Sequence, residues 1–314
     1  MIFRTLEEAA GRFGPCALTI GNFDGVHAGH RRILRRVVEL ARERGWKPSA
    51  MTFDPHPARI VAPERVPPLV TTPEQRAALM SEEGIEQVLI LPFTREISLM
   101  EPEEFAGRIL VRTLDARAVL VGDNFRFGHR HAGDTRMLAR FGEQFGFVTE
   151  IIPAIRLRGR VVSSSEIRRL VAAGRVSLAG RLLESPFALQ GEVVPGRGIG
   201  SKQTVPTLNL APETGVLPAL GVYVTRTRDL ASARVWPSVS NVGHRPTFGP
   251  GALTIETFLL DPLDAPTPQS IRVEFLHRLR PERKFPTPEA LKVQILRDVA
   301  RARAYFRRRT PKRH

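Results

Sequence analysis

The chain has 314 residues, of which 42% are hydrophobic, and its formal net charge is +15. This length is enough for two domains with cores of their own, and no stretch is long and apolar enough to span a membrane. The first residues lack the apolar segment of a signal peptide, and the single cysteine, Cys16, excludes an intramolecular disulfide bond. We therefore expect a cytoplasmic protein without a membrane partner.

The positive charge has three possible explanations: a nucleic-acid partner, a polyanionic substrate such as ATP, or a compositional bias toward arginine. Lysine occurs at only five positions, and the arginines are spread along the chain. RNA-recognition motifs with strands rich in aromatic residues are not apparent, and there are only two Tyr and two Trp. We expect no nucleic-acid partner, and a basic RNA-binding protein is the alternative from a different functional class.

The first predicted elements are a strand, a turn and a helix. Residues 16–20 form an apolar run typical of a buried strand, residues 21–25 form a glycine-containing turn, and the apolar residues that follow have helical spacing. His27 and His30 are three residues apart and therefore share one face of the first helical turn. A helix N-terminus suits an anion, so this stretch predicts a phosphate site. An ordinary capped helix or a metal-binding pair are the alternatives.

The complete constellation, Gly-x-Phe-Asp-Gly-x-His-x-Gly-His, resembles the signature of the bacterial bifunctional riboflavin kinase/FMN adenylyltransferase family. In that family the motif lies in an α/β Rossmann-like nucleotidyltransferase domain. The resemblance implies that FMN attacks the α-phosphorus of ATP and that pyrophosphate leaves. It also implies substrate-binding or catalytic roles for the motif residues, which are Gly21, Phe23, Asp24, Gly25, His27, Gly29 and His30.

Strand-like and helical runs then alternate. The predicted strands are residues 48–53, 88–91, 118–121 and 147–152, and the predicted helices are residues 73–83, 102–113 and 135–144. With the first strand, this alternation predicts a parallel sheet of five strands covered by helices on both faces. Ligands bind such sheets at the carboxyl ends of the strands.

Two loops after predicted strands resemble further motifs of the same family. Residues 53–57 are Phe-Asp-Pro-His-Pro, and residues 124–128 are Asn-Phe-Arg-Phe-Gly. A rigid proline loop and a surface hairpin are the alternatives. The resemblance implies that these loops bind FMN and ATP, with the phenylalanines as candidates for stacking on the flavin. The residues implied are Phe53, His56, Asn124, Phe125 and Phe127.

Residues 163–168, Ser-Ser-Ser-Glu-Ile-Arg, resemble the second phosphate motif of the family. The resemblance implies that Ser163 and Ser164 bind the nucleotide. It also implies that Arg168, together with Mg²⁺, holds the departing phosphates, for which a guanidinium is well suited. An ordinary N-cap followed by a helix is the alternative.

The pattern changes near Pro186, after two short helices at residues 165–173 and 177–183. We therefore predict one domain over residues 1–185 and a second over residues 186–314. Short alternating runs follow, at residues 187–194, 221–226, 234–242, 253–260 and 271–279, and then one helix at residues 288–306. They predict an antiparallel β-barrel with a C-terminal helix. The apolar residues Leu291, Ile295, Leu296 and Val299 are the predicted buried face of that helix.

The second half resembles the riboflavin kinase module of the same family. The resemblance implies that Glu256 takes the proton from the riboflavin 5′-hydroxyl, with Asp261 as the rival carboxylate and an exposed strand residue as the alternative. Thr207 and Asn209, in Pro-Thr-Leu-Asn, would bind Mg²⁺ through oxygen. The implied ATP-binding residues are Gly196, Gly198, Gly200, Lys202, Asn241 and Arg245.

The second half also departs from the family pattern. Leu208 replaces an alanine, residues 203–205 replace Leu-Gly-Phe, and residues 262–270 replace Leu-Tyr-Gly. The resemblance nevertheless extends over residues 18–306. We therefore predict an enzyme that converts riboflavin to FMN and FMN to FAD, with riboflavin, FMN, FAD and MgATP as its ligands. A nucleotidyltransferase for another phosphorylated acceptor is the alternative within the same class.

Overall fold

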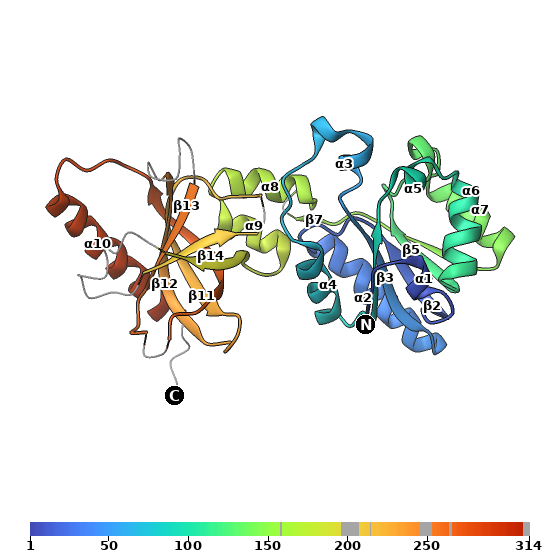
Figure 1. Cartoon of the computed structure of the whole chain (residues 1–314), viewed down its shortest axis with the longest axis horizontal. Helices are drawn as coiled ribbons and strands as arrows, with labels where there is room; N and C mark the ends of the chain where they lie inside the picture. Colours follow the sequence, from blue (N-terminus) through green and yellow to red (C-terminus); the bar gives the residue numbers. More distant parts are fainter. Residues whose placement is uncertain (158, 196–206, 214, 245–252, 264–265, 310–314) are drawn as a thin grey trace. The chain divides into compact units, whose positions relative to one another are not determined.

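The computed structural model describes residues 1–157, 159–195, 207–213, 215–244, 253–263 and 266–309 (Figure 1). Its contacts divide the chain into two compact units, Met1–Ser164 and Ser165–His314. Among the described residues, no helix combines the length and the apolar character that a membrane crossing requires.

The first unit contains a six-stranded parallel sheet, which confirms the predicted fold class. The strands lie in the order β1-β4-β3-β2-β5-β6. The sequence did not predict β1, because a strand of two residues is too short to show an alternation of apolar and polar side chains. The strands are β1 Ile2–Phe3, β2 Cys16–Ile20, β3 Lys47–Asp54, β4 Gln87–Pro92, β5 Ala116–Gly122 and β6 Val148–Ile152.

The strand order reverses between β2 and β5. From β2 the chain proceeds outward to β3 and β4, and it then returns to add β5 and β6 on the other side of β2. In open parallel sheets, ligands bind beyond the carboxyl ends of the strands at such a reversal. The residues that follow β2 and β5 are therefore placed for binding.

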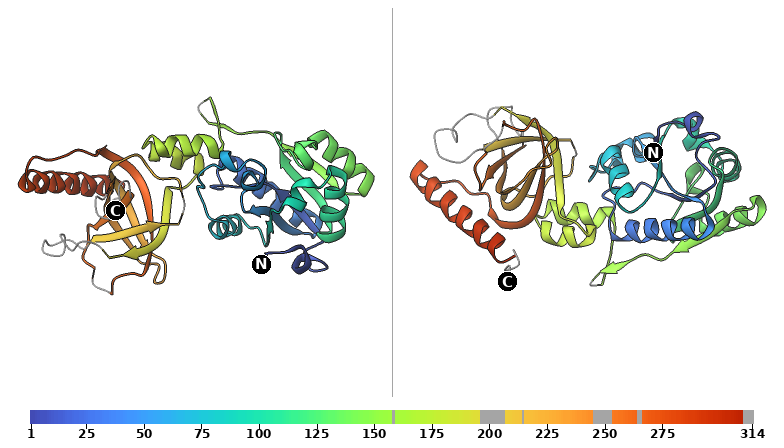
Figure 2. Two further views of the ribbon diagram at one scale, coloured as in Figure 1. Left: turned by 45° about the horizontal axis from the view of Figure 1, so that its top comes forward. Right: turned by 90° about the horizontal axis from the view of Figure 1, so that it is seen from below.

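Helices cover both faces of the sheet, as predicted (Figure 2). Because side chains alternate along a strand, Ala17 packs in one core and Leu18 in the other. The first core includes α2 Ala28–Arg44 and α4 Pro73–Glu82. The second includes α1 Leu6–Ala9, α7 Thr135–Phe145 and the π-helix η2 Phe105–Thr113, which continues α6 Pro102–Glu104.

Several short elements complete the first unit. They are α3 Ala58–Val61, η1 Pro63–Arg65, α5 Arg95–Leu99, η3 His129–His131, and the antiparallel pair β7 Arg156–Leu157 and β8 Arg160–Val161. The helix α8 Ser164–Ala172 then begins at the last residue of this unit, and α9 Val176–Leu183 follows it.

The second unit contains a closed antiparallel barrel in the order β10-β13-β12-β11-β14-β9, which confirms the predicted architecture. Five of the strands were predicted. The sixth, β10, contains the Thr-Leu-Asn part of the motif. The strands are β9 Phe187–Val194, β10 Thr207–Pro212, β11 Gly221–Asp229, β12 Val235–His244, β13 Leu253–Leu259 and β14 Ser270–Pro281.

Hydroxyl groups line part of the barrel interior. Five of them, from β11, β12 and β13, are fully buried and joined by hydrogen bonds of 2.8–2.9 Å: Thr225, Thr227, Ser238, Ser240 and Thr257. Each hydroxyl can both donate and accept, so the chain of contacts satisfies groups that burial would otherwise penalise. Because these residues point inward, their sequence neighbours Asn241 and Glu256 point outward.

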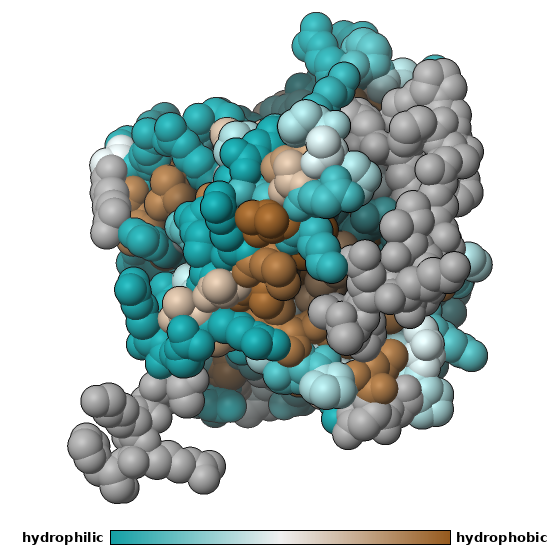
Figure 3. Space-filling view, turned by 90° about the vertical axis from the view of Figure 1, so that its left-hand side faces the viewer, coloured by the Kyte–Doolittle hydropathy of each residue, from teal (hydrophilic) through white to brown (hydrophobic). Residues whose placement is uncertain are grey.

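The last helix, α10 Pro288–Arg307, is present, and its predicted buried face is only partly correct. Val299 packs against a buried apolar cluster, and Ile295 is half-buried. Leu291 and Leu296 are 41% and 60% exposed, whereas Gln294 and Asp298 are buried. The reason is polar pairing: Arg280 Nε donates to Asp298 Oδ2 (2.8 Å), and Gln294 Nε2 donates to Asp298 Oδ1 (2.9 Å). Figure 3 shows hydrophobic side chains exposed at the surface on one face of the molecule.

Candidate active sites

The turn between β2 and α2 has an unusual backbone. Phe23 and Val26 have φ angles of 48° and 40°, in the left-handed region that β-branched residues seldom adopt. Each such residue costs about 1–3 kcal/mol and persists only where its surroundings impose it. Non-glycine residues in this conformation concentrate at functional sites, so the strain marks this turn as a candidate site.

Asp24 holds this turn in place. Its carboxylate is 1% exposed and accepts hydrogen bonds from Val70 N (3.0 Å), Thr71 N (2.9 Å) and Thr71 Oγ1 (3.1 Å). Gly25 N in turn donates to Thr71 Oγ1 (2.9 Å). These hydrogen bonds join the turn to the loop that precedes α4. The predicted motif residue Asp24 therefore stabilises the conformation of the turn.

His27 and His30 lie together at the start of α2. Their rings are stacked, with centroids 3.6 Å apart and planes 14° apart, and His27 Nδ1 caps the helix by accepting from His30 N (3.3 Å). A Cβ atom on Gly29 would lie 3.2 Å from the His27 ring, so a larger residue would displace that ring. The edge of Phe23 packs on His30 at 5.0 Å. The predicted pair is therefore a built arrangement rather than two surface residues.

Both histidines are neutral at pH 7 in this site. Burial lowers the pKa of His27 to about 4, and burial, followed by the proximity of His27 and Arg76, lowers the pKa of His30 well below 6.5. Since His27 Nδ1 accepts a hydrogen bond, the proton of the neutral ring resides on Nε2. Each ring can thus donate one hydrogen bond, and an arriving anion would raise both pKa values.

These shifts predict that acid destabilises the first unit. Between pH 6.5 and 4 the unfolded state binds a proton at His27 that the folded state does not, so stability falls as the pH decreases. We expect His27 to contribute a loss of about 2 kcal/mol between pH 7 and 4.5. Urea unfolding at both pH values measures it, with Trp46 fluorescence as the probe in a Trp236→Phe background. An unchanged pH dependence in His27→Gln would contradict this assignment.

The predicted loop after β3 reaches the same turn. Asn22 Nδ2 lies 3.3 Å from His56 Nε2, and His56 Nδ1 accepts from Ala58 N (3.2 Å). Phe53 is partly buried, with its ring against Phe93 at a centroid distance of 5.5 Å. The structure therefore places His56 and Phe53 at the carboxyl end of the strand next to β2.

The predicted loop after β5 divides its aromatic residues between the surface and the core. Asn124 is exposed and Phe125 is partly buried. Phe127 is 6% exposed; its ring packs on Phe105 at 5.7 Å and on Phe125 at 5.5 Å. Of the three predicted flavin-stacking residues, Phe53 and Phe125 retain accessible ring surface, whereas Phe127 mainly supports Phe125.

The predicted serine motif also meets the turn. Ser164 Oγ donates to the backbone oxygen of Asp24 (2.8 Å), so the start of α8 is held beside the histidine loop. Ser163 is partly buried next to it. Arg168 lies one helical turn further along α8, in the second unit, and its phosphate-binding role remains a prediction.

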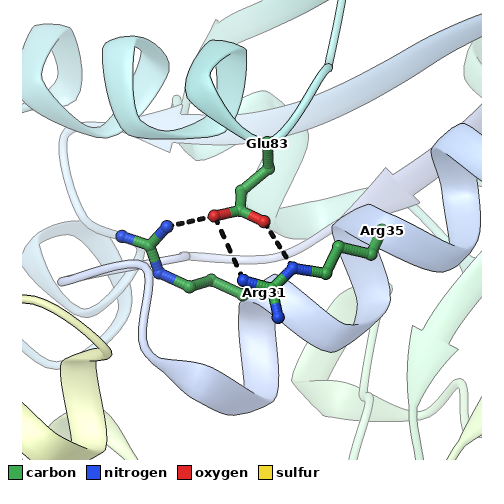
Figure 4. A network of polar contacts seen from close by, with 3 residues as sticks. All are labelled: Arg31, Arg35 and Glu83. Atoms are coloured by element: carbon green, nitrogen blue, oxygen red, sulfur yellow. Dashed lines mark hydrogen bonds and ion pairs between the residues drawn. The ribbon is translucent and has the colours of Figure 1, made fainter.

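The helices behind the histidine pair are joined by ion pairs (Figure 4). Glu83, directly after α4, is bound by Arg31 and by Arg35, whose Nε lies 2.7 Å from Oε2. Although burial acts to raise it, the hydrogen bonds from Arg35 and Arg31 hold the pKa of Glu83 below its usual value. Because Arg31 follows His30 directly, this contact holds the first turn of α2 against α4.

The second candidate site is a row of polar side chains on the outside of the barrel. Glu256 on β13 stands directly opposite Asn209 on β10 and Asn241 on β12. Side chains opposite each other on neighbouring strands have Cβ atoms about 4.5–5.5 Å apart. The three predicted residues, far apart in the sequence, therefore form one row, and the exposed Asp261 lies beyond the end of β13.

Thr207 extends this row along β10, two residues before Asn209 and thus on the same face. Its Oγ1 atom is buried, and no hydrogen-bond partner for it exists within the described part of the chain. Leu208, the departure from the family pattern, is 2% exposed and points into the barrel, away from this face. The predicted residues Gly196, Gly198, Gly200, Lys202 and Arg245 lie outside the described residues.

Sequence reasoning missed two residues of the first site, Thr71 and Arg76. Thr71 binds Asp24, and the buried Arg76 donates to the backbone oxygen of Asn22 (2.8 Å). In the sequence Thr71 belongs to an unpatterned loop and Arg76 to an ordinary helical run. No local signal distinguishes them, because their partners are about 50 residues away.

Comparison with known proteins finds a separate family match for each half of the chain. A family model described as FAD synthetase matches residues 11–166, and one described as riboflavin kinase matches residues 183–306. A solved structure from Streptococcus pneumoniae, described as a macrolide-efflux protein, has a TM-score of 0.84 over 96% of this chain and 98% of its own. At 24% sequence identity it shows likeness of fold alone.

The curated relatives extend over nearly the whole chain. The bifunctional riboflavin kinase/FMN adenylyltransferase of Pseudomonas fluorescens is 38% identical over 96% of this chain and 97% of its own length. That of Escherichia coli (strain K12) is 34% identical over 93% of each chain. Both family models match in the predicted order, and the sequence identity extends over nearly the whole chain. The chain therefore belongs to the bifunctional riboflavin kinase/FMN adenylyltransferase family.

Proposed function

We propose that the two activities of the family are divided between two domains, residues 1–185 and residues 186–314. The N-terminal domain transfers AMP from ATP to FMN, and the C-terminal domain phosphorylates riboflavin. The observation that supports this proposal most is that separate predicted motifs of the N-terminal half meet at the first site. Asn22 contacts His56, Ser164 contacts Asp24, and the stacked histidines lie at the start of α2, directly after the turn that contains Asn22 and Asp24.

In adenylyl transfer, a phosphate oxygen of FMN attacks the α-phosphorus of ATP, and the bond to the β-phosphate breaks. Such transfers depend on positioning and charge stabilisation more than on covalent participation of the protein. His27 and His30 donate N–H groups to the α-phosphate as its charge increases, and Arg168 binds the departing pyrophosphate. Phe53 and Phe125 provide ring surface for the isoalloxazine.

In riboflavin phosphorylation, the 5′-hydroxyl of riboflavin attacks the γ-phosphorus of ATP, and ADP leaves. Glu256 accepts the hydroxyl proton as the new bond forms. Its cross-strand neighbours Asn209 and Asn241 hold the carboxylate in a fixed row and present amide groups to the phosphates.

The residues of β10 fit a magnesium ion in the kinase site. The buried Thr207 Oγ1 atom has no partner among the described residues, and Asn209 offers a second neutral oxygen on the same face. Hard cations prefer oxygen ligands, and Mg²⁺ often binds through few protein groups plus substrate phosphates. When bound there, the ion would neutralise negative charge on the ATP phosphates.

One assay tests this function against its alternatives. The protein is incubated with riboflavin and MgATP, and the flavins are separated over time. We expect FMN to appear first and FAD to follow, and we expect EDTA to stop both steps. FAD formed only from added FMN would show an inactive kinase half. The absence of both products, together with RNA affinity that falls steeply with salt, would support the nucleic-acid alternative.

A further inference from the structure

Arg76 links the two predicted substrate loops of the first unit from behind. It lies on α4 and is 1% exposed. Its Nη1 donates to the backbone oxygen of Asn22 (2.8 Å) and to Thr52 Oγ1 (3.0 Å). Asn22 belongs to the turn after β2, and Thr52 to the carboxyl end of β3. A single side chain therefore joins the ends of two neighbouring strands at the point where ligands bind such sheets.

The charge of Arg76 is buried at a cost. Within the described part of the chain, its hydrogen-bond acceptors are carbonyl and hydroxyl oxygens, and its Nε atom has none. Burial lowers the pKa of Arg76, while the charges of Asp24 and Asp54 act in the opposite direction. Among the described residues, the guanidinium thus hydrogen-bonds only to neutral oxygens, while the carboxylates of Asp24, Asp54 and Glu74 act on its charge through space. A buried cation of this kind can contribute to the attraction of a polyanion.

This charge acts on the histidine pair. His30 is faced by the ring of His27, by the edge of Phe23 and by the field of Arg76, and Asp24 acts on His27. The positive charge of Arg76 opposes protonation of His30. The positive charge of Arg76 thus helps to keep the ring of His30 neutral at pH 7.

We propose that Arg76 is a positioning residue for adenylyl transfer: it fixes Asn22 and Thr52 relative to each other, and it places a permanent positive charge near the histidine pair to receive the nucleotide phosphates. The proposal rests on the assignment of the histidine pair to adenylyl transfer. The proposed role requires both the several N–H donors of a planar guanidinium and its positive charge. Lysine supplies the charge but not this donor geometry, so we expect it to replace arginine only in part.

Three full-length variants test the proposal: Arg76→Gln, Arg76→Lys and, as the matched control, Arg42→Gln, which removes an exposed arginine near the other end of α2. We expect Arg76→Gln to lower kcat for FAD formation from FMN about 100-fold, as small misplacements of a reacting group do. Arg76→Lys should lose about tenfold, and Arg42→Gln should match the wild type. Riboflavin phosphorylation should be unchanged in all three.

Ring nitrogen NMR provides a second readout. The pKa of His30, assigned by comparison with His30→Ala, should rise in Arg76→Gln and remain low in Arg76→Lys and Arg42→Gln. Normal kcat in folded Arg76→Gln, or an unmoved His30 pKa there, would overturn the proposal. If Arg76→Gln does not fold, normal kcat in Arg76→Lys overturns it instead. Normal FAD formation by His30→Ala would instead refute the assignment of the histidine pair to adenylyl transfer.

Discussion

His30→Ala is expected to lower the rate of FAD formation from FMN by about 10³-fold, the loss typical when a preorganised donor to a developing charge is removed. The substitution also removes the ring that stacks on His27 at 3.6 Å, so the remaining imidazole loses its stacking partner, although its hydrogen bond from the backbone N–H of residue 30 can remain. Initial rates of FAD formation at saturating FMN and MgATP measure the effect.

The second activity of the same molecule is the internal control for His30→Ala. Riboflavin phosphorylation should proceed at the wild-type rate, because we assign it to residues of the barrel. Equal loss of FMN and FAD formation would contradict the division of labour between the two domains. Nearly normal FAD formation would show that the imidazoles are not at the reacting phosphate.

Glu256→Gln is expected to lower riboflavin phosphorylation by about 10³-fold, within the usual range for loss of a general base. Glutamine preserves the shape of the side chain and its place opposite Asn209 and Asn241, but it cannot accept the hydroxyl proton. The formation of FMN from riboflavin and MgATP is measured, with FAD formation from supplied FMN as the control activity.

The matched variant for this test is Asp261→Asn, which changes the rival carboxylate in the same way. Asp261 is exposed and lies beyond β13, outside the row. We expect it to retain wild-type phosphorylation. A large loss of activity in Asp261→Asn, combined with retained activity in Glu256→Gln, would contradict our assignment. It would show that Asp261, and not Glu256, accepts the hydroxyl proton.

Short-range patterns predicted most of the architecture. The alternation of apolar strands and helices indicated the parallel sheet, and short runs separated by Gly and Pro indicated the barrel. These signals are local, so they failed where an element is very short or where another signal dominates. The strand β1 has only two residues, and β10 was interpreted through its Pro-Thr-Leu-Asn motif rather than as a strand.

The helix α10 shows how long-range pairing can override a local pattern. Leu291 and Leu296 have the spacing of a buried stripe, yet they are exposed. The helix is oriented instead by Asp298, which pairs with Arg280 on β14. A buried carboxylate without its partner is costly, so the position of Arg280 decided which face is covered.

The sequence by itself determined which residues could carry the chemistry: the Gly-Asn-Phe-Asp-Gly turn with its two histidines, the Phe-Asp-Pro-His-Pro loop and the strand that contains Glu256 all follow from patterns of a few neighbouring residues. The tertiary structure alone decided their state. Burial makes His27 and His30 neutral, the barrel register aligns Glu256 with Asn209 and Asn241, and Arg76 joins the turn after β2 to the end of β3. Desolvation, strand register and the contacts of a buried cation depend on residues that are distant in the chain. They therefore cannot be predicted from a pattern of neighbouring residues.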